Sequence, residues 1–337
     1  MAQRWNNRPE GSNWGDFGPD DQIGRINLLT PERTRRAAEE IREGISFCLG
    51  LPLDLPGGMV LNTRRGPPEL RPVMRDGEVS FNLSLSDHDP LHTDVTCDDA
   101  LFLYNQYSSQ WDSLAHMGAH FDADGDGEAE RVFYNGWQVV DGRGQGTHGP
   151  VGARNLGIEN MAESGVQGRG VMIDLYAHFG DARHHVGYDD LMTVMAADDV
   201  DVEDGDMVCL HTGLGRLIMD ADGEPDPALR AACPVLEGRD EKLLQWITDT
   251  GLVVLASDNQ AVEASTQLGR EMTAPGPALP LHEHCLFKLG VHLGEFWYLS
   301  ELADWLRNTG RYRFFLTAPP LRMPGAVGSP ATPVATV

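Results

Sequence analysis

Residues 116–127, HMGAHFDADGDG, bring two histidines together with a run of aspartates and glycines. His116, His120 and Asp122 follow the spacing H-x-x-x-H-x-D, and two imidazoles with one carboxylate are a common ligand set for zinc, manganese or iron. Gly118 lets the backbone pass close to such an ion. Three protein ligands leave a position for water, whose pKa falls to about 7 on zinc, so the segment predicts a metal site that supplies hydroxide near neutral pH.

The same segment has a second interpretation as a calcium loop. The D-x-D-x-D-G start of an EF-hand loop is matched by Asp122, Asp124, Asp126 and Gly127. The twelfth loop position should carry a bidentate glutamate, and here it is Phe133. Because imidazole is a poor ligand for calcium, the histidines weigh against this interpretation. A non-catalytic binding protein with a structural calcium at 122–127 is therefore the alternative, and an Asp-Gly turn is a third interpretation.

A second polar cluster lies far downstream, in PLHEHCLFKLGVHLGE at residues 280–295. Its polar members are His282, Glu283, His284, His292 and Glu295. Histidines inside an otherwise apolar stretch are expected where side chains line a pocket within a packed domain. We therefore expect the two clusters to form one site, in which His282 or Glu295 accepts a proton from water.

Three aromatic residues flank the first cluster. Trp111, Phe133 and Trp137 are predicted to wall a pocket for an apolar or aromatic substrate. Packing in the hydrophobic core is the alternative for each of them taken singly.

Elements in the second half of the chain alternate in type. Apolar runs rich in β-branched and aromatic residues predict buried strands at 170–176, 206–213, 252–258 and 313–319. Helical spacing and end signals predict helices at 188–197, 240–250 and 299–308, and Thr30-Pro31 is typical of a helix start. Residues 52–68 and most of 124–150 are expected to be loop. Strands that alternate with helices indicate an α/β domain.

Composition excludes several classes of protein. The 337 residues carry 26 Lys+Arg against 51 Asp+Glu, a formal net charge of −25, which disfavours nucleic acid and anionic lipid as partners. No apolar run approaches the roughly 20 residues that span a bilayer, and the N-terminus has no apolar signal-peptide region. Five scattered cysteines without a CxxC pair indicate reduced thiols and a cytoplasmic location. The chain has no GxSxG, Walker A or Rossmann motif in the required context.

Beyond these features, the chain resembles a family. HMGAHFD is similar to the H-x-G-T-H-x-D motif of the cyclase family of metal-dependent hydrolases, which includes bacterial kynurenine formamidase and isatin hydrolase. Further blocks similar to its longer members follow in order: NWGDFGPDDQIGRINLLTPE (13–32), QWDSLAHMG (110–118), FYNGW (133–137), LGIENMAESGVQGRGVMID (156–174), DGDMVCLHTG (204–213), ASDNQAVEA (256–264), LPLHEHCLFKLGVHLGE (279–295) and PLRMPGAVGSPATPVA (320–335).

The resemblance implies a single α/β domain of the swivelling β/β/α type over residues 1–337, with an N-terminal extension at about 1–65. It implies a homodimer or homotetramer that uses a divalent metal, zinc or manganese. It also implies hydrolysis of an amide, lactam, lactone or related acyl bond in a small cyclic or aromatic substrate.

Site residues carry over by position. His116, His120 and Asp122 match the family's three metal ligands, and Asp126 stands where the family has a further histidine. Ala119 and Asp124 replace the family's threonine and proline.

The downstream residues match the family's H…E pair. His282 and Glu295 fit it best, although their spacing is one residue longer than in short members, and His284 is the competing histidine. Another registration pairs Asp112 with His116 in QWDSLAH, which brings Asp112 into the site and leaves His120 to line the pocket.

Overall fold

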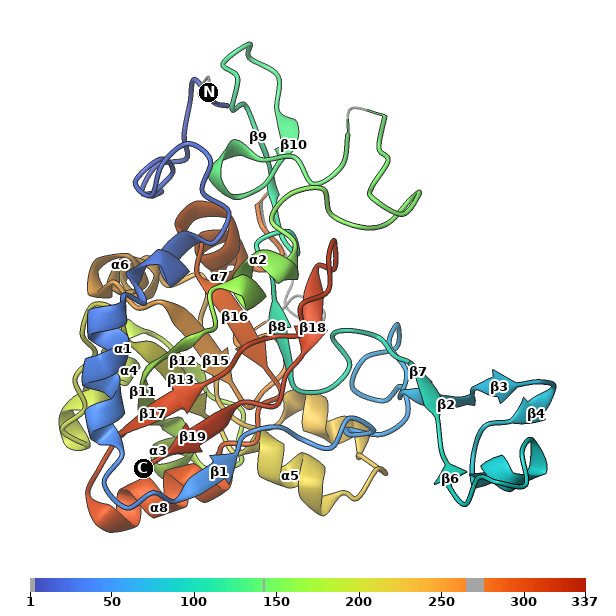
Figure 1. Ribbon diagram of the computed structural model, residues 1–337. Coiled ribbons are helices and arrows are strands. Elements are labelled where there is room, and N and C mark those ends of the chain that lie inside the picture. The colour runs from blue at the N-terminus through green and yellow to red at the C-terminus, as the bar shows by residue number, and fades with distance from the viewer. Residues whose placement is uncertain (1–3, 142, 265–275) are drawn as a thin grey trace.

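A curled sheet of nine strands lies at the centre of the computed structural model, which describes residues 4–141, 143–264 and 276–337 (Figure 1). In spatial order its strands are β1 (Ser46–Cys48), β19 (Val334–Thr336), β17 (Arg313–Thr317), β11 (Gln167–Asp174), β13 (Met207–His211), β15 (Val254–Ser257), β16 (His292–Glu295), β8 (Gln110–Asp112) and β18 (Gly328–Pro330). The four strands from β11 to β16 are parallel, and the strands on both sides of them pair antiparallel.

The four predicted apolar runs form the strands β11, β13, β15 and β17. They read as nearly continuous apolar runs because the sheet is covered on both faces. In β11, for example, Val171 and Ile173 belong to one core cluster and Met172 to the other. The α/β prediction is therefore confirmed.

Helices cover the sheet. They are α1 (Pro31–Ala37), α2 (Ile158–Glu163), α3 (Leu175–Phe179), α4 (Tyr188–Ala197), α5 (Leu214–Asp220), α6 (Glu241–Thr250), α7 (Pro280–His282) and α8 (Ser300–Thr309). Shorter 3₁₀ segments are η1 (Gly24–Leu28), η2 (Ala38–Glu40), η3 (Leu85–Asp87), η4 (Tyr134–Gly136) and η5 (Pro227–Ala231), and η7 (Glu283–Leu289) is a π-helix. Among the described residues, no helix is long and apolar enough to cross a membrane.

The predicted helix ends are found in the structure. Asp240 caps α6 by accepting from the backbone N–H groups of Lys242 (2.9 Å) and Leu243 (3.3 Å). Gly251 ends the same helix in the left-handed region at φ 68°, which glycine adopts without a Cβ clash. At α1, the side chain of Thr30 accepts from the N–H of Arg33.

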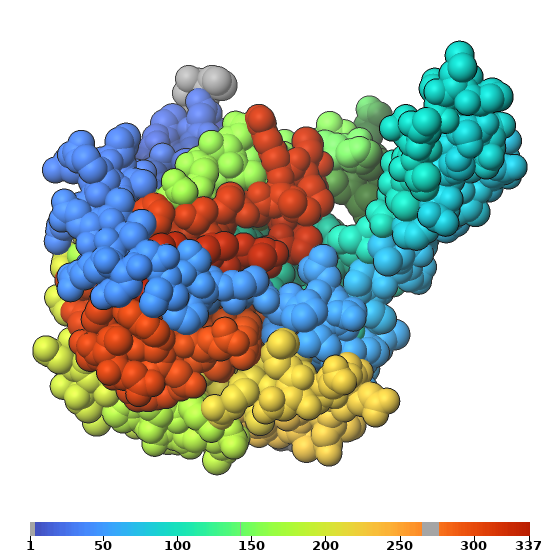
Figure 2. Space-filling view, turned by 60° about the horizontal axis from the view of Figure 1, so that its bottom comes forward, coloured from blue at the N-terminus to red at the C-terminus, as the bar shows by residue number. Residues whose placement is uncertain are grey.

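Two-stranded sheets complete the fold. They pair β2 (Glu69–Pro72) with β7 (Asp99–Phe102), β3 (Met74–Arg75) with β4 (Glu78–Val79), β5 (Leu83–Ser84) with β6 (Val95–Thr96), β9 (Ala119–Phe121) with β10 (Glu130–Val132), and β12 (His185–Val186) with β14 (Val235–Leu236). The first three build an arm, residues 66–104, that projects from the body of the molecule (Figures 1 and 2).

The arm carries a high share of the exposed apolar surface. Of the fifteen large apolar side chains exposed among the described residues, nine lie in the arm: Leu70, Met74, Val79, Phe81, Leu91, Val95, Leu101, Phe102 and Tyr104. Small two-stranded ribbons bury little apolar surface by themselves, so the arm lacks a core of its own.

Candidate metal centre

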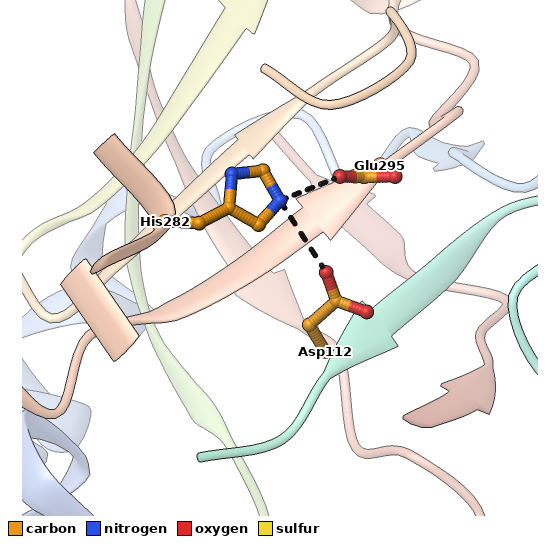
Figure 3. A group of neighbouring side chains, drawn as sticks. All are labelled: Asp112, His282 and Glu295. Atoms are coloured by element: carbon orange, nitrogen blue, oxygen red, sulfur yellow. Dashed lines mark hydrogen bonds and ion pairs between the residues drawn. The ribbon is translucent and has the colours of Figure 1, made fainter. Parts of the chain in front are cut away.

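Three acidic or imidazole side chains from separate parts of the chain meet beside strands β8 and β16. Asp112 comes from β8, Glu295 from β16, and His282 from the end of α7 (Figure 3). Nε2 of His282 lies 3.3 Å from Oε1 of Glu295 and 3.9 Å from Oδ2 of Asp112. One donor atom of each residue lies within 4.8 Å of the others, a separation at which the three atoms could share one ion.

The register of the two strands sets this arrangement. β8 and β16 are antiparallel, with Asp112 opposite Leu293 and Gln110 opposite Glu295. Side chains alternate between faces along a strand, so Asp112 and Glu295 share one face as diagonal neighbours. Gln110, on that face, donates from Nε2 to Oε2 of Glu295 at 2.9 Å and leaves Oε1 directed toward His282.

The site formed by these three residues is buried, and one of its carboxylate oxygens lacks a hydrogen-bond partner in the described part of the chain. Asp112, His282 and Glu295 are all buried, and Oδ2 of Asp112 has no hydrogen-bond partner among the described residues. Burial, reinforced by the charge of Glu295, raises the pKa of Asp112, although His116 and His282 act in the opposite direction. A buried carboxylate oxygen without a partner is costly, and coordination of a cation would satisfy it. The donor set present therefore fits a divalent ion.

His116 lies on the solvent side of these three residues. Its Nε2 is 3.9 Å from Oδ2 of Asp112, and its side chain retains 21% exposure. Gln106 joins the two residues, because its Nε2 donates to Asp112 and lies 2.8 Å from Nδ1 of His116. We call Asp112, His116, His282 and Glu295 together the centre.

Glu263 orients the histidine at the middle of the centre. This fully buried carboxylate contacts Nδ1 of His282 at 2.9 Å and accepts from the backbone N–H groups of His282 (2.8 Å) and Leu281 (3.0 Å). The Nδ1 contact turns Nε2 toward Glu295 and Asp112. A carboxylate on the second nitrogen is the usual support for a metal-binding histidine.

Charge within the centre is strongly coupled. Burial acts to lower the pKa of His282, but hydrogen bonds with Glu263 and Glu295 outweigh it and raise the pKa to about 10. Burial likewise opposes ionisation of Glu295, and its contact with His282 overcomes this and lowers the pKa of Glu295. The protein alone thus stabilises an imidazolium between carboxylates, a place that a metal cation would take.

Sequence reasoning did not single out Glu263 or Gln106 as site residues. Glu263 lies within the block ASDNQAVEA (256–264) and follows the buried strand β15 by a few residues. An acidic residue shortly after a parallel strand was the available signal, because strand ends often carry functional side chains.

The first predicted ligand set is not brought together. His120 lies on β9 opposite Arg131, and its side chain is exposed. The segment is a strand rather than a helix, so residues four apart do not share a helical face there. The structure instead groups His116 with Asp112, as in the alternative registration.

The acidic residues after His120 stabilise their own turn. Asp122 accepts from the N–H groups of Gly125 (2.7 Å) and Gly127 (3.1 Å), and exposed Asp126 accepts from the N–H of Glu128. These are Asx-type hydrogen bonds, which the third interpretation of the segment predicts. Asp122 and Asp126 therefore lie outside the centre. Carboxylates of Asp122, Asp124 and Glu130 do approach within 4.8 Å, a different trio from the EF-hand positions.

His284, the competing histidine, also lies outside the centre. Its Nε2 contacts Oγ1 of Thr248 on α6 at 2.9 Å, and burial lowers its pKa to about 4. His282 is thus the histidine that meets Glu295.

The three aromatic residues have different surroundings. Trp111 is fully buried, packs edge-on against Trp297 at 4.9 Å, and donates to the carbonyl of Ala318, because it lies on the face of β8 opposite Asp112. Its role is core packing rather than lining of a pocket.

Trp137 and Phe133 lie nearer the surface. Trp137 donates to the carbonyl of Asp21 and stacks under the guanidinium of Arg4 at 3.3 Å. Phe133 lines a cavity of about 840 Å³ together with His120, Phe121 and residues that flank His116 and His282 in sequence. Of the three predicted pocket residues, Phe133 lines this cavity.

Comparison with known proteins agrees with this architecture. Residues 60–264 match the family model Cyclase, described as "Putative cyclase". A crystal structure described as a novel cyclase is 31% identical, covers 97% of both chains and has a TM-score of 0.73. No match was found among curated proteins.

Two isatin hydrolase structures share the fold at lower identity. Isatin hydrolase A from Ralstonia solanacearum is 15% identical, with a TM-score of 0.53, over 91% of this chain and 97% of that chain. Isatin hydrolase A from Labrenzia aggregata is 13% identical, with a TM-score of 0.52, over 89% and 95%. The predicted fold class, the α/β domain of that family, is confirmed. With a family match over more than half its length and a 31% identical relative along nearly all of it, the chain belongs to the cyclase family.

Proposed function

We propose that this protein is a metal-dependent hydrolase that cleaves an amide, lactam, lactone or related acyl bond in a small cyclic or aromatic substrate. The observation that carries the proposal is the unpartnered buried oxygen of Asp112 beside Nε2 of His282 and Oε1 of Glu295. Membership of the cyclase family and the fold shared with isatin hydrolases support the same reaction class.

Asp112, His282 and Glu295 are the residues assigned to hold the ion. Two carboxylates and one imidazole suit zinc or manganese, and their two negative charges balance a divalent cation. When bound, such an ion supplies a water of low pKa and polarises the scissile carbonyl. Glu263 keeps the ring of His282 in the orientation that this assignment requires.

His116 is assigned to proton transfer. The amide nitrogen of Gln106 can only donate, and its contact with the carboxylate of Asp112 fixes which end of the amide faces His116. Nδ1 of neutral His116 therefore accepts, and the ring proton lies on Nε2, which faces the centre. From there the ring can donate to the leaving nitrogen or oxygen and exchange protons with solvent.

The test separates metal binding from proton transfer. Metal content is measured by elemental analysis, and hydrolysis is measured on formamides, cyclic imides, isatin-like lactams and unsaturated lactones. Asp112→Asn with His282→Ala should lose both zinc or manganese and hydrolysis, whereas His116→Ala should keep the metal and lose about 100-fold or more in kcat. His185→Ala, at an exposed position on β12 and outside both the centre and the cavity, is the matched histidine control.

Three results would contradict the proposal or one of its assignments. Full metal content and hydrolysis in the double variant would remove the centre from the reaction. Calcium as the sole bound ion, with no hydrolysis of any compound class, would favour the binding protein with an acidic loop at 122–127. Loss of metal from His116→Ala equal to that from His282→Ala would make His116 a ligand instead of a proton donor.

We also propose that the protein acts as a homodimer or homotetramer on a small-molecule substrate, without nucleic acid or membrane as partner. The apolar arm at residues 66–104 supports the oligomer, since a surface of this kind is typical of a protein interface. The net charge of −25 supports the absence of polyanionic partners.

A further inference from the structure

The guanidinium of Arg65 lies at the edge of the centre. Nη1 donates to the backbone carbonyl of Gln106 at 2.7 Å, and the side chain of the same Gln106 contacts both Asp112 and His116. Arg65 comes from the loop between β1 and β2. A single residue, Gln106, connects it by contacts to two members of the centre.

Most of the hydrogen-bonding capacity of Arg65 is unused. A guanidinium has five N–H donors, and one backbone carbonyl takes a single donor. Within the described ranges, Arg65 forms no ion pair, and none of its nitrogens is both buried and unpartnered, so the remaining donors face solvent. Arg169, by contrast, is fully engaged with Asp206 and Glu203.

The negative charges near Arg65 indicate a role for its guanidinium in ligand binding. Asp112, Glu263 and Glu295 place three buried carboxylates at the site, in a chain whose net charge is −25. An anionic ligand approaching such a site is repelled unless a positive group receives it. A guanidinium with free donors binds a carboxylate through two parallel hydrogen bonds, which lysine cannot reproduce.

We infer that Arg65 binds a carboxylate of the ligand beside the centre, so that the preferred substrates are acyl compounds with an acidic group or compounds whose hydrolysis places a new carboxylate there. This inference rests on the proposed function and specifies the substrate class of the same site. In both cases the group that binds the guanidinium of Arg65 is a carboxylate.

The first experiment measures ligand binding to the metal-loaded protein by calorimetry, with benzoate and benzamide as matched probes. Arg65→Ala should weaken benzoate binding about 10- to 100-fold and leave benzamide binding unchanged. Arg65→Lys should give an intermediate loss. Arg64→Ala is the matched control, because it removes the same charge from an exposed neighbour and should bind both probes like the parent protein.

A kinetic arm distinguishes the two sources. The compounds are N-formylanthranilate and formanilide, which differ by one carboxylate. A rise in KM for N-formylanthranilate alone in Arg65→Ala identifies the carboxylate of the substrate. Unchanged KM values with loss of inhibition by benzoate identify the carboxylate released by hydrolysis.

Equal benzoate affinity in Arg65→Ala and the parent protein would overturn the inference. So would an equal loss in Arg64→Ala and Arg65→Ala, since that result would reflect net charge rather than a contact. Metal content and formanilide hydrolysis in Arg65→Ala are measured in parallel. If both persist while benzoate binding is unaffected, the inference fails and the proposed hydrolase function stands.

Discussion

At the scale of single residues, the centre depends on the protonation states of two buried groups, Asp112 and His282. Burial pushes Asp112 toward its neutral form, while the imidazole of His282 between carboxylates is pushed toward its charged form. Both pKa values are raised, so both groups favour their protonated forms, and strongly perturbed pKa values of neighbouring buried groups cluster at functional sites. Sequence spacing could identify His116, His282 and Glu295, because each belongs to a polar cluster in an apolar context.

The residues that sequence spacing could not assign are those whose role depends on folding. Glu263 lies 19 positions before His282 and reaches it through space. Asp112 was available only as an alternative ligand, because nothing in QWDSLAH shows which face of the strand turns inward. Choosing between Asp112 and His120 requires the register of β8 against β16.

Replacement of Glu263 by Gln tests the orientation of His282. The amide keeps the size of the side chain but removes the charge that contacts Nδ1 of His282. We expect metal affinity to fall about 10- to 100-fold, measured by competition with a chelator, while the melting temperature of the metal-free protein changes much less. The Gln110→Glu variant, which changes the partner of Glu295 instead, is the comparison. Unchanged metal affinity in Glu263→Gln would show that this carboxylate has only a structural role.

Buried His292 should make the free energy of unfolding depend on pH. Burial lowers its pKa to about 3, and its Nδ1 has no partner among the described residues. The unfolded state, with a pKa near 6.5, therefore binds the proton first, so this residue favours folding above pH 6.5 and progressively loses that effect as pH falls toward 3. Each pH unit in that window costs roughly 1.4 kcal/mol for one proton.

Denaturant unfolding at pH 7, 6, 5 and 4 measures this effect. The free energy of unfolding should fall with decreasing pH more steeply in the parent protein than in His292→Leu. The difference isolates one histidine from the many carboxylates that also titrate. Parallel pH profiles for the two proteins would contradict the assignment.

At the scale of elements, helices and central strands were predictable because their signals are local. α4 begins and ends at the predicted residues 188 and 197, and α6 ends at the predicted Gly251. The short strands β8 and β9 gave no such signal, since three residues are too few to show a period. The H-x-x-x-H-x-D spacing therefore predicts one ligand set, although His120 lies on β9 and His116 and Asp122 lie outside that strand.

Asp240 offers a test at this scale. Its carboxylate caps α6 and also accepts from the N–H of Tyr188 at the start of α4. Asp240→Ala should lower the free energy of unfolding by about 1–2 kcal/mol, measured with urea, because donors at two helix starts lose their acceptor. Asp240→Asn retains an acceptor and should lose less. Equal losses in both variants would indicate that charge, rather than hydrogen bonding, is the important property.

At the scale of the whole molecule, the arm is the feature that a single chain leaves unexplained. Leu91 is 88% exposed at its surface, and Leu70 is 75% exposed. Sequence could not anticipate this, because apolar residues in a short strand look the same whether they face a core or solvent. We expect the arm to be covered by a second copy of the chain.

Light scattering coupled to size-exclusion chromatography tests this expectation. The parent protein should elute as a dimer or tetramer, and Phe81→Asp with Leu91→Asp should shift it toward the monomer. Ile41→Asp with Leu321→Asp is the control, since these side chains are exposed outside the arm. A monomeric parent protein, or an oligomer that survives the arm substitutions, would contradict the role of the arm.

The π-helix η7 has a consequence for how the centre tolerates variation in chain length. It lies between His282 and β16, and its backbone closes turns over five residues instead of four. A wider turn accommodates an additional residue. The imidazole before the turn keeps its orientation, and the glutamate after it keeps its register with β8. An inserted residue in this segment changes the shape of one turn and leaves the chemistry at both its ends in place.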